Sequence, residues 1–149
     1  MHQETPIWIV TGDFGRATVN VTDRALVEHA HQQFNMLFML DGAETTFRTG
    51  TTDLPLDRSS VILFNPWVPH LKLANDGEPT MILSLVIEQG WIDRMLEAQG
   101  LRSGLVFPNV LERMTSAVQL AAQRLAGAIS RGLCDSVEDR EQPLMELID

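Results

Sequence analysis

Residues 29–42 read His-Ala-His-Gln-Gln-Phe-Asn-Met-Leu-Phe-Met-Leu-Asp-Gly, and this stretch decides the fold. From Phe34 to Leu40 both alternating faces are apolar except at Asn35, so neither face of a strand there is expected to be exposed to solvent. A barrel strand satisfies this pattern when its inner face lines a dry interior and a helix or a partner subunit covers its outer face. The stretch therefore predicts a barrel strand that is buried on both sides.

The chain on either side of this stretch, from Pro6 to Ile87, consists of short apolar or alternating runs separated by turn residues. No helical periodicity of useful length occurs there, so we expect strands. Asp41-Gly42 between two such runs is a hairpin signal. About eight strands at this spacing predict a β-sandwich or barrel. The predicted strands are 7–10, 17–21, 26–31, 34–40, 45–49, 60–64, 69–74 and 80–87.

Helices are expected after Gln89. Residues 91–99 form a short amphipathic segment with Gly100 as its C-cap, and a longer helix is expected from Val110 to Arg131. Apolar residues recur in that segment at the alternating steps of three and four that are typical of a helix-pair seam. The seam could join two chains in a dimer or dock the helix on its own barrel, and the sequence leaves both open. Its residues are Leu111, Met114, Val118, Ala121, Leu125 and Ala128.

Length and composition limit the function classes. The chain has 149 residues, 44% of them hydrophobic and 21% charged, which suits one folded domain. Its net charge of −9 opposes direct binding to nucleic acid. No apolar stretch could span a bilayer, no secretory signal is visible, and the single cysteine, Cys134, cannot form an internal disulfide. We therefore expect a cytoplasmic protein that binds neither membrane nor, by itself, DNA.

The histidines carry the candidate chemistry. His29 and His31 lie on one face of a strand because side chains alternate with period two, and Asn35 has the same parity. His70 follows the turn at residues 65–69, so a neighbouring strand could bring a third imidazole to the same place. Three histidines are a recognised metal-ligand set, but they can equally hydrogen-bond within the fold or to a ligand. The same alternation places Leu37 and Met39 deeper in the pocket that these polar residues would line.

Two motifs resemble known ones. His29-x-His31, three residues, Asn35, six residues and Gly42 resembles the first cupin motif, with asparagine in place of its glutamate. The segment from Asn65 to His70 resembles a degenerate second cupin motif that ends in its histidine but lacks its glycine. With the helices that follow, the order is similar to the N-terminal sensor domain of AraC-type transcription regulators.

This resemblance implies a mainly β fold, a cupin-like double-stranded β-helix barrel over residues 1–88. The helical segment 89–149 is expected to pack on the barrel and to serve as linker and homodimer interface. A small-molecule effector would bind His29, His31, Asn35, Leu37, Met39 and His70. DNA would be contacted only through a helix-turn-helix domain that this chain lacks, and the apolar pattern cut off at Asp149 suggests that the native protein continues.

The resemblance also bears on cofactors and catalysis. Most sensor domains of this family work without a metal, so no cofactor and no enzymatic activity are expected. The alternative is a small metal-dependent cupin enzyme, in which His29, His31 and His70 hold a divalent ion.

Overall fold

The computed structural model describes residues 7–102, 104, 107 and 109–130. Strands predominate, and they form two antiparallel sheets in the described part of the chain. The elements are β1 (Ile7–Gly12), β2 (Gly15–Thr22), β3 (Leu26–His29), β4 (Phe34–Gly42), β5 (Thr45–Thr49), β6 (Thr52–Leu56), β7 (Ser60–Phe64), β8 (His70–Lys72), β9 (Thr80–Ile87), α1 (Gln89–Ala98), β10 (Leu111–Arg113) and α2 (Ser116–Ser130). The order is the predicted one, a mainly β unit followed by helices.

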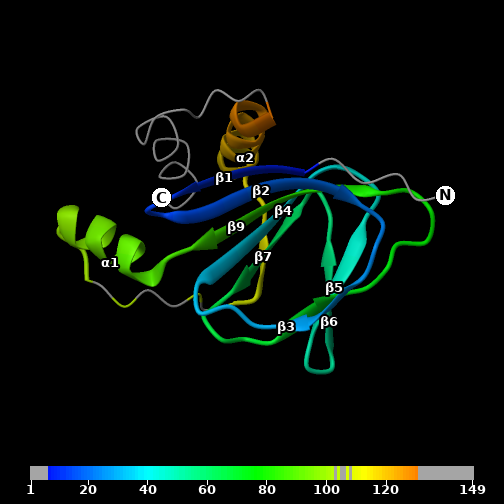
Figure 1. Ribbon diagram of the computed structural model, residues 1–149, viewed down its shortest axis with the longest axis horizontal. Helices are drawn as coiled ribbons and strands as arrows, with labels where there is room; N and C mark the ends of the chain where they lie inside the picture. The colour runs from blue at the N-terminus through cyan, green and yellow to red at the C-terminus, as the bar shows by residue number, and fades with distance from the viewer. Residues whose placement is uncertain (1–6, 103, 105–106, 108, 131–149) are drawn as a thin grey trace.

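The two sheets face each other across an apolar interior. One has the strand order β1-β2-β9-β4-β7-β10, and the other has the order β3-β8-β5-β6. In Figure 1 the larger sheet lies above the strands β3, β5 and β6 of the smaller one. Between them lies a core made of Leu37, Met39, Phe47, Leu54, Leu56, Ile62, Phe64 and Ile82.

Strand β4 is buried on both faces, as its sequence predicts. It lies between β7 and β9, with Met36 opposite Leu63 on one side and Leu85 on the other. Leu37 and Met39 face the core between the sheets, whereas Met36 and Phe38 face a second core on the outer side. Helix α2 covers this outer side and lies across β1 and β2 (Figure 1). A helix of the same chain is therefore the cover that β4 requires.

The outer-side core includes part of the predicted helix seam. Ala121 and Leu125 are 5% and 2% exposed and pack against the chain's own sheet, and Val118 and Ala128 are partly buried against the same core. Gln123 Nε2 also donates a hydrogen bond to the carbonyl of Leu40, at 3.1 Å. Dimerisation through this helix stays a prediction, and these contacts occupy the seam side of α2.

The predicted start of the second helix at Val110 is wrong. Leu111 belongs to β10, where it pairs with Ile62 of β7, and Met114 lies in the connection that follows. By pairing with β7, residues 111–113 satisfy the backbone N–H and C=O groups at the edge of that strand. Those groups of β7 would lack these partners if residues 111–113 were helical. The helix begins later, after Thr115, whose Oγ1 accepts a hydrogen bond from the amide of Val118 at 3.2 Å.

The predicted hairpin at Asp41-Gly42 is also wrong. Strand β4 pairs with β7 and β9, whereas β5 pairs with β6 and β8, so the chain crosses from one sheet to the other at this turn. Gly42 has φ 89°, and a Cβ there would lie 2.4 Å from the carbonyl oxygen of Pro79. The glycine is required by this close approach and not by a tight hairpin.

Helix α1 ends as its sequence predicts. Gly100 has φ 75°, and its amide donates to the carbonyl of Glu97 while that of Leu101 donates to Leu96. No helix in the described residues is both long and apolar enough to span a membrane. Cys134 and the end of the segment 89–149, from residue 131 on, lie outside the described residues.

Candidate functional site

Three imidazoles converge at one end of the space between the sheets. His29 ends β3 and stands opposite His70, the first residue of β8, in the antiparallel register of that pair. His31 ends the predicted strand 26–31, but β3 stops at His29, so His31 lies in the connection to β4. The ring centroids of His29 and His70 are 4.5 Å apart, those of His29 and His31 4.9 Å, and those of His31 and His70 5.5 Å. The structure therefore joins the three histidines that the sequence analysis selects.

Backbone carbonyls fix the tautomers of two of these rings. Nδ1 of His29 lies 2.7 Å from the carbonyl oxygen of Val27, and Nδ1 of His70 lies 2.9 Å from that of Val68. A carbonyl only accepts, so each Nδ1 carries the hydrogen and donates it. In the neutral ring Nε2 then keeps its lone pair. A hydrogen bond of this kind orients metal-binding histidines in proteins.

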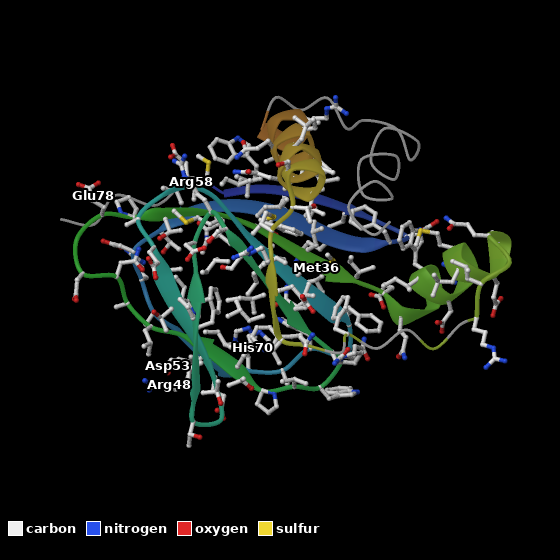
Figure 2. All side chains as sticks on the ribbon, turned by 180° about the vertical axis from the view of Figure 1, so that it is seen from behind. Met36, Arg48, Asp53, Arg58, His70 and Glu78 are labelled. Atoms are coloured by element: carbon white, nitrogen blue, oxygen red, sulfur yellow. The ribbon has the colours of Figure 1, made fainter. Side chains whose placement is uncertain are left out.

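His70 is the most enclosed of the three rings. It is 2% exposed and stacks on Phe64, with centroids 4.0 Å apart and planes inclined by 9°. Figure 2 shows His70 between the two sheets. Burial lowers the pKa of His70 to about 4, although its bond to the Val68 carbonyl acts in the opposite direction. His70 is therefore neutral at pH 7, which is the protonation state that metal binding requires.

His31 lies in a different setting, at the edge of the cluster. Burial lowers its pKa first, and the positive charges of His29 and Arg16 lower it further. Each added charge in the cluster would repel the next, so His31 and His70 favour their neutral forms. A neutral ring keeps the lone pair that a divalent ion would need.

The donor atoms suit a divalent ion in type and, after a small movement, in spacing. One nitrogen from each of the three rings lies within 4.8 Å of the others. Tetrahedral ligation at Zn–N lengths of about 2.0–2.1 Å places ligand nitrogens about 3.4 Å apart, so binding needs the rings to approach by roughly 1 Å. His31 lies outside the strand pairing and can supply part of that movement.

The side-chain amide of Asn35 ties β4 to β9. Its Nδ2 donates to the hydroxyl of Ser84 at 3.1 Å and to the carbonyl of Leu85 at 3.0 Å, and the residue is 3% exposed. A neutral amide thus stands where the cupin motif places a carboxylate.

Two cavities border the cluster. The first has a volume of about 200 Å³ and contains His29, Asn35 and Leu37 among its lining residues. The second has a volume of about 340 Å³ and contains His31. Of the predicted pocket residues, Met39 lies in the core between the sheets and His70 is buried beside Phe64, and neither lines these two cavities. His29 and His31 therefore line different cavities, and Arg16 lines both.

The sequence analysis missed one wall of the first cavity. Strand β2 contributes four residues that alternate along it: Thr22 is buried, Thr18 and Asn20 are half-buried, and Arg16 is exposed. The signal was present as a period-two polar pattern in a predicted strand, but such a pattern ordinarily marks the solvent side. The other residues missed in this lining are Leu26, Phe47, Lys72, Ile82 and Ser84.

Lys72 contributes charge to the first cavity but no free hydrogen. It is 1% exposed, and its Nζ donates to the carbonyls of Arg24 at 2.6 Å and Leu73 at 3.0 Å and to Oδ1 of Asn75 at 3.3 Å. Burial lowers the pKa of Lys72, and the carboxylate of Asp23 raises it. These contacts use the ammonium to hold the loops after β2 and β8.

No protein-family model and no curated protein sequence matches the chain. Solved structures do. A cupin-like protein from Thermotoga maritima MSB8 is similar with a TM-score of 0.51 and 16% identity over 58% of this chain and 71% of its own. A predicted oxalate decarboxylase from Thermotoga maritima has a TM-score of 0.50 and 14% identity, over 58% of this chain and 82% of its own. A provisionally assigned mannose-6-phosphate isomerase from Ralstonia eutropha JMP134 has a TM-score of 0.51 and 10% identity, over 58% of this chain and 87% of its own. These similarities show the cupin fold.

Proposed function

We propose that this cupin-fold protein binds a divalent transition-metal ion through His29, His31 and His70, and binds a small molecule beside it. The observation that supports this best is the convergence of three imidazoles whose ligand atoms lie within 4.8 Å of one another. Two of them have Nδ1 committed to a backbone carbonyl, which leaves Nε2 for the ion. The buried, stacked position of His70 holds one ligand in place.

An ion held by three histidines keeps open coordination positions, where it polarises a bound oxygen or lowers the pKa of a bound water. The chain supplies the rest of the site. His29 lines the first cavity and His31 the second, so a molecule in either space lies next to the cluster. The apolar residues Leu37 and Phe47 exclude water from one side of the first cavity. This arrangement suits a small metal-dependent cupin enzyme.

A second candidate is the small-molecule-sensing domain of an AraC-type regulator. The asparagine at position 35 favours it, because its amide is committed to Ser84 and Leu85 where metal-binding cupins have a carboxylate. In that case the effector occupies the first cavity without an ion, and a dimer carries the response to DNA-binding domains outside this chain. Ligand binding by metal-free protein at full affinity supports this candidate over the enzyme.

The metal is tested by calorimetric titration of chelator-treated, untagged protein with Zn²⁺ and Mn²⁺. We expect one ion per chain for the native protein and no saturable binding for His29→Ala or His70→Ala. The matched control is His2→Ala, which removes the fourth histidine of the sequence and is expected to keep one ion per chain. Unchanged binding by both cluster variants, with their circular dichroism intact, would refute the proposal.

A further inference from the structure

The first cavity has an unusual charge for this protein. The chain carries 20 acidic and 11 basic residues, yet this cavity is lined by Arg16, Lys72 and His29 and by no aspartate or glutamate. Because Lys72 has its hydrogens committed to three oxygens, Arg16 is the cation with donors to offer. A cationic wall in an acidic protein favours an anionic ligand.

One polar atom in this wall lacks a partner. Oδ1 of Asn20 is buried and accepts no hydrogen bond within the described residues. Asn20 lines the same cavity as Arg16 and lies four residues further along β2. A buried acceptor left unpaired is costly, so the site is completed by a ligand that brings a hydroxyl or an amine to this oxygen.

The spacing and the volume limit the size of the ligand. Strand residues rise about 3.3 Å each, so the Cα atoms of Arg16 and Asn20 are about 13 Å apart, and an arginine side chain leaning inward covers about half of that distance. A ligand must therefore carry its anionic group and its donor about 7 Å apart. A cavity of about 200 Å³ holds roughly seven waters at ~30 Å³ each, which is the room of a molecule with a short carbon chain.

We propose that the first cavity binds a short organic carboxylate that carries a hydrogen-bond donor at its far end. Arg16 binds the carboxylate at the mouth, Asn20 accepts from the donor, and the carbon chain packs against Leu37 and Ile82. This assignment names the ligand class of the site under Proposed function and rests on that proposal for the neighbouring imidazoles. The hydroxyls of Thr18 and Thr22 lie on the same wall.

The test uses three probes of one length: 6-hydroxyhexanoate, hexanoate, which lacks the donor, and 1,6-hexanediol, which lacks the charge. Calorimetry on native protein should give the tightest binding for 6-hydroxyhexanoate, with the diol about tenfold weaker because it lacks a charge-assisted bond. Arg16→Gln should remove the advantage of the acid over the diol. Asn20→Leu should remove the advantage of 6-hydroxyhexanoate over hexanoate. Arg102→Gln, a matched loss of charge outside both cavities, should change neither.

Each titration is run on chelator-treated protein and on protein saturated with Zn²⁺. Binding of 6-hydroxyhexanoate that depends on Arg16 without metal supports the inference even if the three-histidine proposal fails. Binding that requires Zn²⁺ and is unaffected by Arg16→Gln overturns it, because the carboxylate is then held by the ion. Failure of all three probes to bind at millimolar concentration also overturns it.

Discussion

Replacing Leu125 with glutamate tests whether α2 belongs to the core of its own barrel. Leu125 is 2% exposed and packs in the outer-side core with Ala121 and Ala122. Truncating a buried leucine costs about 2–5 kcal/mol, and an unpaired buried carboxylate costs several kcal/mol more. Domains of this size are stable by only about 5–15 kcal/mol. We therefore expect Leu125→Glu to unfold and not to yield a folded monomer.

Urea unfolding by circular dichroism, with sedimentation velocity on the same samples, measures both possibilities. The milder Leu125→Ala should lower the midpoint by about 1–2 M urea, from a loss near 3 kcal/mol and a slope of about 2 kcal/mol/M. Leu120→Glu is the matched control, because Leu120 lies on the same helix and is 54% exposed. Its free energy of unfolding should stay within about 0.5 kcal/mol of the native value.

The reasoning is refuted if Leu125→Glu keeps its β-rich spectrum and changes only from dimer to monomer, since the buried face of α2 would then be the dimer interface. A native dimer that Leu120→Glu dissociates would instead place the predicted interface on the exposed face of the helix.

Three further predictions concern the site and the sheet crossing. His70 has a pKa of about 4 in the folded protein against 6.5 for an ordinary histidine, so the unfolded chain binds the proton more readily. The contribution of His70 to the stability of metal-free protein should therefore be complete above pH 6.5 and decrease toward pH 4. In His70→Gln the urea midpoint should change less with pH over this range. Gly42→Ala should cost a few kcal/mol more than Gly77→Ala in thermal unfolding, because both have positive φ but only the first meets a carbonyl oxygen. Asn35→Leu should cost about 1–3 kcal/mol in urea unfolding by leaving the Leu85 carbonyl without this partner; an unchanged midpoint would contradict the role given to that amide.

Local patterns were sufficient to predict much of the barrel. The apolar run of β4 indicates a strand buried on both sides wherever it sits, and the spacing of His29 and His31 places them near one another in any extended backbone. The turn at residues 65–69, and then the motif resemblance, added His70, which is far away along the chain. What these features share is that each depends on alternation or on a recognised order of residues.

The misses depend on partners that the sequence does not display. Strand β6 contains Pro55, which argues against a strand, but β6 is the edge of its sheet and needs no donor on its outer side. Strand β10 exists because β7 has a free edge, and its sequence alone reads as the start of a helix. The polar wall at Thr18, Asn20 and Thr22 has the pattern of a solvent face until the second sheet covers it.

The pairing of β3 with β8 also affects the order of folding. His29 and His70 are 41 residues apart in the sequence, about half the length of the barrel, and they meet only when the smaller sheet has closed. Closing so long a loop carries an entropic cost that local contacts do not repay, so this pairing is expected late in folding. An ion added during refolding would then bind only at the final stage, so the time course of metal binding would report the closure of the smaller sheet.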